Sequence, residues 1–293
     1  MRAAFIHYHL RGGGVTRVIR HAVETLNRTG GEYIIFSGEP PATDDVTPEN
    51  VCVLPELAYG PPKEKPNPEL IVRRMLDQCK ANMSGTPDVW HFHNHALGKN
   101  VTVPLIVDFL AKNDYPLLLQ LHDFAEDNRP VNYEFLCDQL QGTELLDKNG
   151  VPTIYPRKGR THYAVLNQRD KQYLQSAGVP GDRLDALPNA VWLEDGGEKE
   201  QENAGRKESR PLFVYPGRAI RRKNIGEFLL WAGVCDEKGC FAITLEPKNP
   251  VERTAYNAWV DFTEKHNLPV EFNYGITSGL SFPQILREAE AVF

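Results

Sequence analysis

Residues 214–225 read VYPGRAIRRKNI, which joins an apolar run to a cationic loop and then to the start of a helix. Residues 213–215 favour a β-strand, and Gly217 is expected to let the backbone turn sharply. Asn224 is a candidate cap for a helix that contains the apolar run 228–231. Backbone amides, a helix N-terminus and four cations would then converge, and this combination predicts a phosphate-binding loop.

Arg218 and Lys223 are the residues of this loop that we expect to hold the phosphates. The guanidinium of Arg218 is planar and suits bidentate contact with a phosphate, and Lys223 supplies a compact charge on the far side of the turn. A diphosphate would fit between them. The alternative is that Arg221, Arg222 and Lys223 form only a solvated basic turn.

The bulk composition limits the class of protein. With 293 residues, of which 41% are hydrophobic, the chain can bury a substantial core and suggests two domains. The net charge of −6 leaves no general excess of cations to neutralise a duplex, so no nucleic-acid partner is expected. Positive charge is local, and local charge suits a small anionic ligand.

The cysteines and the apolar runs indicate a compartment. The five cysteines are scattered without CxxC spacing, and an odd number fits a reducing compartment better than a disulfide framework. The first apolar run is too short for a signal peptide, and no later run reaches the roughly 20 residues that span a bilayer. We therefore expect a soluble, cytoplasmic protein without a transmembrane segment.

Strand-length apolar runs alternate with amphipathic helical segments from the first residue, beginning with 3–8, 15–26 and 33–37. This alternation predicts an α/β fold with a parallel sheet covered by helices on both faces. Residues 1–190 are sufficient for one complete Rossmann-like, doubly wound domain.

A polar stretch separates this domain from a second round of the same alternation. Residues 195–210 include no large apolar residue, so 191–210 is interpreted as a linker or exposed loop. The alternation restarts in 211–293, which we expect to form a second, incomplete Rossmann-like domain, because its units number about three and a half and such folds need five or six strands.

Three glycines follow the first predicted strand and lead into a helix. Gly12, Gly13 and Gly14 permit positive φ angles and a close backbone approach to a ligand at the carboxyl end of the sheet. The spacing is not GxGxxG, so the dinucleotide fingerprint is not matched. A plain strand-to-helix turn would explain one glycine well and three poorly.

Residues 121–130 read LHDFAEDNRP and place polar side chains directly after a predicted strand. Ionisable residues at the carboxyl end of a strand are typical of a site in this topology, and His122 with Asp123 is the leading pair. Glu126, Asp127 and Arg129 are weaker candidates. The alternative is that Asp123, Glu126 and Arg129 only cap the loop by ion pairing.

The histidines at 91, 93 and 95 invite a metal-binding interpretation, because alternate residues of a strand share a face. We discount it, since no carboxylate stands at a recognised metal spacing such as HExxH, and no metal site is predicted. His7 and His9 end the first strand near the same crevice and are equally ambiguous.

Taken in order, these motifs resemble the retaining glycosyltransferases of two-Rossmann (GT-B) architecture, specifically the large family 4. The matching positions of the phosphate loop are Gly217, Arg218 and Lys223. The resemblance implies that Arg218 and Lys223 neutralise the nucleoside diphosphate as it leaves the sugar. It also implies that the glycines at 12–14 close over the donor sugar and its diphosphate.

The same resemblance assigns roles around the second motif. His122 would contact the donor sugar and the reaction centre, with Asp123 beside it, and Glu126, Asp127 and Arg129 would lie on the acceptor side. The family's Glu-x7-Glu motif has no counterpart here, because Glu288 and Glu290 lack that spacing. We therefore expect a C-terminal segment or a second chain to be needed for activity.

The resulting prediction is a retaining hexosyltransferase that transfers a sugar from a UDP- or GDP-linked donor to an acceptor, without a cofactor. Neither the acceptor nor the oligomeric state is indicated. The main alternative is a non-catalytic relative that binds a nucleotide sugar or phosphorylated ligand and regulates through it. Metal-dependent hydrolysis through the histidines is a third hypothesis.

Overall fold

The computed structural model describes residues 1–41, 49–190, 210–235, 239–247 and 250–293. The chain divides into two compact units, Met1–Asp195 and Gly196–Phe293. Nearly all of the predicted linker, residues 191–209, lies outside the described residues. No helix among the described residues is both long and apolar enough to cross a membrane.

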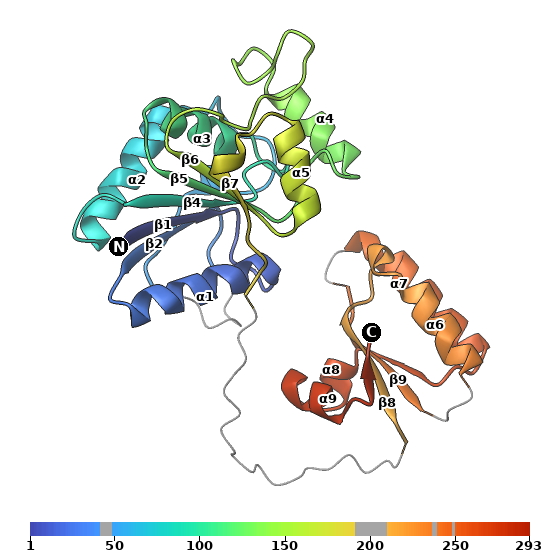
Figure 1. Ribbon diagram of the computed structural model, residues 1–293. Helices are drawn as coiled ribbons and strands as arrows, with labels where there is room; N and C mark the ends of the chain where they lie inside the picture. The colour runs from blue at the N-terminus through green and yellow to red at the C-terminus, as the bar shows by residue number, and fades with distance from the viewer. Residues whose placement is uncertain (42–48, 191–209, 236–238, 248–249) are drawn as a thin grey trace. The chain divides into compact units, whose positions relative to one another are not determined.

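The first unit contains a parallel sheet of seven strands in the order β3-β2-β1-β4-β5-β6-β7 (Figure 1). The strands are β1 (Arg2–His7), β2 (Glu32–Ser37), β3 (Val51–Val53), β4 (Val89–His93), β5 (Leu117–Leu121), β6 (Thr161–Val165) and β7 (Leu184–Ala186). The helices are α1 (Gly14–Arg28), α2 (Pro68–Asn82), α3 (Thr102–Lys112), α4 (Pro130–Gln139) and α5 (Gln168–Ser176). The order reverses between β1 and β4, as in a doubly wound fold.

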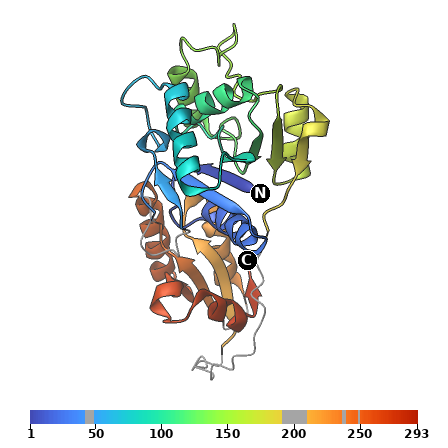
Figure 2. The same ribbon diagram turned by 90° about the vertical axis from the view of Figure 1, so that its left-hand side faces the viewer.

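Alternate residues of the strands pack on opposite faces of this sheet. Phe5 of β1 packs with Ile19 of α1, whereas Ile6 belongs to a second buried cluster that includes Met75 of α2 and Ile106 of α3. The ribbon shows α1 on one side of the sheet and α2 on the other (Figures 1 and 2). Because all strands are parallel, their carboxyl ends meet at one edge, where the loops after β1, β4 and β5 begin.

The second unit repeats the design on a smaller scale. Its described residues form a parallel sheet in the order β10-β9-β8-β11. The strands are β8 (Leu212–Arg218), β9 (Cys240–Leu245), β10 (Val270–Phe272) and β11 (Ala291–Val292), and the helices are α6 (Ile225–Val234), α7 (Arg253–Lys265), α8 (Tyr274–Thr277) and α9 (Phe282–Glu288). Here the order reverses between β8 and β11. The predicted class, α/β with two Rossmann-like parallel sheets, is confirmed.

Aromatic packing holds α6 against the second sheet. The ring centroids of Trp231 and Phe241 lie 4.6 Å apart, and those of Phe213 and Phe241 lie 4.9 Å apart. Both distances are in the range of favourable aromatic pairs. The other face of the sheet packs on Tyr274 of α8 and Ile285 of α9. This packing fixes the start of α6 close to the end of β8.

Candidate active site

The reversal points in strand order are where open α/β sheets bind ligands, at the carboxyl ends of the strands. In the first unit this point lies between β1 and β4, so it gathers the residues after His7, His93 and the neighbouring strand end at Leu121. In the second unit it lies beside β8, and Arg218 is the last residue of that strand. Topology alone thus selects the loops that contain the predicted site residues.

Five histidines cluster across the ends of β1, β4 and β5. Nδ1 of His93 lies 3.1 Å from Nε2 of His122, and the rings of His91 and His93 stack with centroids 4.2 Å apart. Nδ1 of His7 lies 3.3 Å from the carbonyl oxygen of His93, and the rings of His7 and His9 are 5.3 Å apart. The cluster therefore connects three strands by imidazole contacts.

These imidazoles are neutral at physiological pH. Burial lowers the pKa of His7 to about 3 and that of His91 to about 4, because a charged ring would lose its hydration. Desolvation also lowers the pKa of His122 to about 4, against a smaller opposing effect of Asp123. His122 can thus donate one hydrogen bond and accept another, but it does not supply a positive charge.

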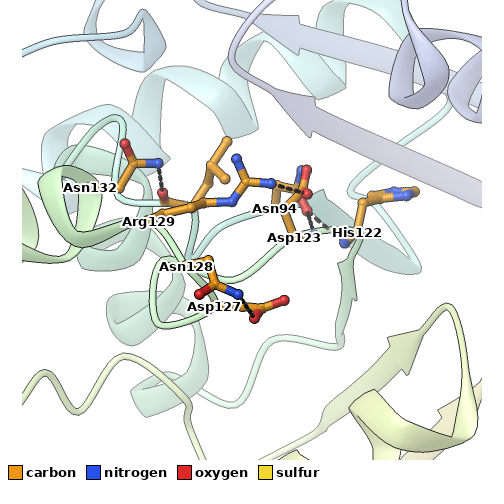
Figure 3. A network of polar contacts seen from close by, with 8 residues as sticks. Asn94, His122, Asp123, Asp127, Asn128, Arg129 and Asn132 are labelled. Carbon is orange, nitrogen blue, oxygen red and sulfur yellow. Dashed lines mark hydrogen bonds and ion pairs between the residues drawn. The ribbon is translucent and has the colours of Figure 1, made fainter. Parts of the chain in front are cut away.

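Asn94 fixes the backbone of the predicted catalytic pair (Figure 3). It follows β4 in the left-handed conformation, with φ 59°, and it is buried. Its Oδ1 accepts hydrogen bonds from the amides of His122, at 2.6 Å, and Asp123, at 3.1 Å. The hydroxyl of Tyr8 donates to the Asn94 carbonyl oxygen at 2.7 Å, which ties the end of β1 to the same network.

The three candidate acceptor-side residues each have a different partner. Arg129 forms an ion pair with Asp123 (Figure 3). This contact is one that the ion-pairing alternative for the loop predicted. Glu126 instead accepts hydrogen bonds from the hydroxyl of Tyr155, at 3.0 and 3.2 Å. Asp127 is bound locally by Asn128, whose Nδ2 donates to Oδ1 at 3.1 Å. The loop therefore directs its charged groups in different directions.

The glycine loop differs from its predicted geometry. None of Gly12, Gly13 and Gly14 lies in the left-handed region, and Gly13 is extended, with φ 176° and ψ 176°. The expected conformational reason for these glycines was wrong. A Cβ on Gly14 would meet nothing within 4 Å and one on Gly13 only the Arg11 carbonyl oxygen at 3.8 Å, so packing does not require glycine at either position. Glycine here leaves open space at the start of α1.

The metal interpretation finds no geometric support within the described ranges. They contain no group of three or more His, Cys, Asp or Glu side chains arranged to hold a metal ion. His91 and His93 share a face, but the left-handed turn at Asn94 removes His95 from their row. Nε2 of His95 lies 3.0 Å from the carbonyl oxygen of Ile154 instead.

The cationic loop of the second unit also corrects two predictions. β8 continues through Gly217, which does not have a positive φ and lies at an irregularity in the pairing with β9 between Tyr215 and Arg218. The left-handed residue is Asn224, with φ 53°, and its side chain forms no cap hydrogen bond to α6. The turn was assigned to the wrong residue because asparagine tolerates this conformation nearly as well as glycine.

Two hydrogen bonds define the shape of this loop. The hydroxyl of Tyr215 donates to the carbonyl oxygen of Lys223, and Oγ1 of Thr244 donates to that of Gly217 at 3.2 Å. Lys223 is exposed and Arg218 is half-buried. Arg221 donates to Glu252 through its amide, at 3.0 Å, and its Nε, at 3.4 Å. Arg221 is therefore engaged by a carboxylate.

No family model matches the chain. It is 25% identical, over 310 aligned positions, to the mannosylglucosyl-3-phosphoglycerate synthase of Petrotoga mobilis, in an alignment that covers 98% of this chain and 59% of that protein. The chain thus spans about three fifths of the length of this curated relative.

Solved structures match over the whole chain. Anabaena HepE in complex with UDP-glucose superposes with a TM-score of 0.60 at 13% identity, covering 100% of this chain and 73% of that one. The lipopolysaccharide outer core galactosyltransferase WaaB superposes with a TM-score of 0.56 at 11% identity, with the same coverage. This chain has the GT-B fold. At these identities the likeness establishes the fold, and the chemistry has to be argued from the residues.

Sequence reasoning missed Asn94, His93 as a partner of His122, and Tyr155. Asn94 could have been suspected, because an asparagine directly after a strand is a common left-handed residue. Its partners lie 28 and 29 residues away, and no local pattern identifies them. Tyr155 stands in a segment without recognisable periodicity, so the sequence offered no signal for it.

Proposed function

We propose that this protein is a family 4-type retaining glycosyltransferase that transfers a hexose from a UDP- or GDP-linked donor to an acceptor hydroxyl. The loop between β8 and α6 is the observation on which this proposal rests. It presents Arg218 and Lys223 at the reversal point of a Rossmann-like sheet, where a diphosphate binds most readily. The GT-B fold and the relative named above support the same reaction class.

In the proposed reaction the bond between the anomeric carbon and the phosphate oxygen breaks, and a bond to the acceptor oxygen forms on the same face of the sugar. The acceptor proton passes to the departing phosphate oxygen, so the products are a glycoside and a nucleoside diphosphate. Arg218 and Lys223 stabilise the charge that develops on the diphosphate. Gly12, Gly13 and Gly14 leave room for the donor, and no further cofactor is needed.

His122 takes part as a neutral hydrogen-bonding group. Burial lowers its pKa, so an uncharged imidazole that donates a hydrogen bond to a sugar hydroxyl fits this site better than a general acid. Glu126, Asp127 and Arg129 are proposed on the acceptor side. Orientation of the sugar, rather than proton transfer, is thus the contribution expected from this loop.

A nucleotide-sugar-binding relative without turnover is the second candidate. The ion pair between Asp123 and Arg129 favours it, because it occupies a carboxylate that would otherwise face a ligand. Both candidates predict nucleotide binding, but only the first predicts transfer of the sugar.

The deciding experiment measures binding first and transfer second. Nucleotides bound only by the folded protein raise its melting temperature, so UDP, GDP, ADP and their sugar conjugates are compared. We expect a shift with one nucleotide class that is lost in Arg218→Ala and Lys223→Ala and retained in Lys265→Ala, an exposed cation on α7. NMR of the product then tests for transfer with retention. Transfer with retention supports the first candidate and excludes the second, and no shift with any nucleotide overturns both.

A further inference from the structure

A pocket of about 330 Å³ lies beside the loop that contains His122 and Asp123. The loop contributes Phe124, Glu126 and Asp127, and the facing wall contains Tyr155, Tyr173 and Leu174. Three of these residues are aromatic and two are carboxylates. The volume is at the lower end of the range of small-molecule sites and suits a ligand with one ring.

The polar groups of the pocket are held by defined contacts. The hydroxyl of Tyr155 donates to both oxygens of Glu126, at 3.2 and 3.0 Å, which orients the carboxylate. Nε of Arg169 donates to the hydroxyl of Tyr173 at 2.8 Å, and the guanidinium lies 5.1 Å from the centre of that ring. Both tyrosine rings are therefore held in place at the pocket wall.

The charge around the pocket is unfavourable to an anion. Glu126 and Asp127 line it, and Asp170 lies close enough that the charges of Asp127 and Asp123 add to the effect of burial in raising its pKa. The nearby cations are Arg169, which stacks on Tyr173, and Arg129, which pairs with Asp123. A phosphate placed here would meet carboxylates that accept hydrogen bonds and offer none.

We propose that this pocket binds an uncharged sugar ring of the acceptor, and the proposal rests on the glycosyltransferase function proposed above. The apolar face of a pyranose would pack on the aromatic side chains, and its hydroxyls would donate to Glu126 and Asp127. Phe124 follows Asp123 directly in the chain, so the bound ring would lie next to the predicted catalytic pair. A phosphorylated part of the acceptor, where one exists, would extend away from this pocket.

The test is ligand-observed saturation-transfer NMR on the full chain without nucleotide. The probes are D-glucose and D-mannose, with glucose 6-phosphate and 3-phosphoglycerate as anionic counterparts. Glu126→Ala removes the oriented carboxylate, and Tyr173→Ala removes an exposed aromatic wall. Glu134→Ala, an exposed carboxylate on α4 outside the pocket, is the matched control.

We expect one neutral hexose to bind in the millimolar range, with affinity reduced about tenfold in Glu126→Ala. A similar loss is expected in Tyr173→Ala, with no change in Glu134→Ala. The proposal would be overturned if the phosphorylated probes bound as tightly as the neutral hexoses or more tightly, or if neither neutral hexose bound. It would also be overturned if hexose affinity were unchanged in both pocket variants.

Nucleotide binding is recorded on the same samples, so that the two proposals fail separately. Hexose binding that responds to the pocket variants, in a protein that binds no nucleotide, would support the pocket and remove the glycosyltransferase function. Nucleotide binding that depends on Arg218, together with hexose binding that is unchanged in Glu126→Ala, would support the glycosyltransferase function and overturn the pocket proposal.

Discussion

At the scale of single residues, the geometry of the active-site candidate depends on one buried asparagine. Asn94 provides both a left-handed backbone and an acceptor for two amides. Asn94→Gly should keep the backbone freedom and lose the acceptor, at a cost of about 1–3 kcal/mol in the free energy of unfolding. Asn94→Ala should lose a further ~1 kcal/mol, because an alanine is strained at positive φ. Urea denaturation measures both, and equal stability of the two variants would contradict the role of the backbone.

The buried histidines predict a pH dependence at the same scale. The pKa of His91 is lowered to about 4 in the folded state, below its ordinary value of 6.5, so the unfolded chain binds more protons between those pH values. The contribution of neutral His91 to the free energy of unfolding is therefore fully present above pH 6.5. It is lost as the pH falls toward 4. His91→Gln should make this slope shallower by up to about 1.4 kcal/mol per pH unit, as read from unfolding free energies between pH 6 and 5 with pH 7.5 as the reference. Parallel slopes for the two proteins would show that His91 is not the group responsible.

At the scale of elements, the loop after β4 contacts both α4 and the start of the 122–129 loop. Gly98 has φ +70°, and a Cβ there would lie 2.3 Å from the carbonyl oxygen of Asn132 in α4. Nδ2 of Asn132 donates to the Leu97 carbonyl oxygen at 2.9 Å, so the side chain of Asn132 also joins the two elements. The approach leaves no space for a side chain at position 98.

Gly98→Ala tests this contact against a matched glycine. Gly142 also has a positive φ, +73°, but a Cβ there meets nothing within 4 Å. Gly142→Ala should therefore cost only the backbone strain of about 1 kcal/mol, whereas Gly98→Ala should cost at least twice as much and change the amide spectra of 122–132. Thermal denaturation and NMR are the measurements. A Gly98→Ala protein as stable as Gly142→Ala would mean that α4 shifts without cost.

At the scale of the whole molecule, each unit has its own buried clusters and its own sheet. Residues 195–210 include no large apolar side chain that could join either core. The same stretch contains several lysines and arginines. Limited trypsin digestion should therefore cut first within 195–210 and leave two stable fragments, identified by mass spectrometry. First cuts within either sheet-bearing unit would contradict this division.

Local chemistry in the sequence was sufficient to predict the elements and the parallel sheets, because apolar periodicity acts over a few residues. It also singled out His122 and the loop of Arg218 and Lys223 as site candidates, and these assignments stay predictions. It misassigned the turn to Gly217 rather than Asn224, since either residue type tolerates a left-handed backbone and neighbours alone do not select between them.

What the sequence could not determine were the contacts between residues far apart in the chain. The bonds from Asn94 to the 122–123 amides and from Tyr155 to Glu126 each join residues 28 or 29 positions apart. The neutral state of the histidines is likewise a product of burial between three strands. Hydrogen-bond partners and desolvation depend on which segments the folded sheet brings together, and that is settled only by tertiary packing.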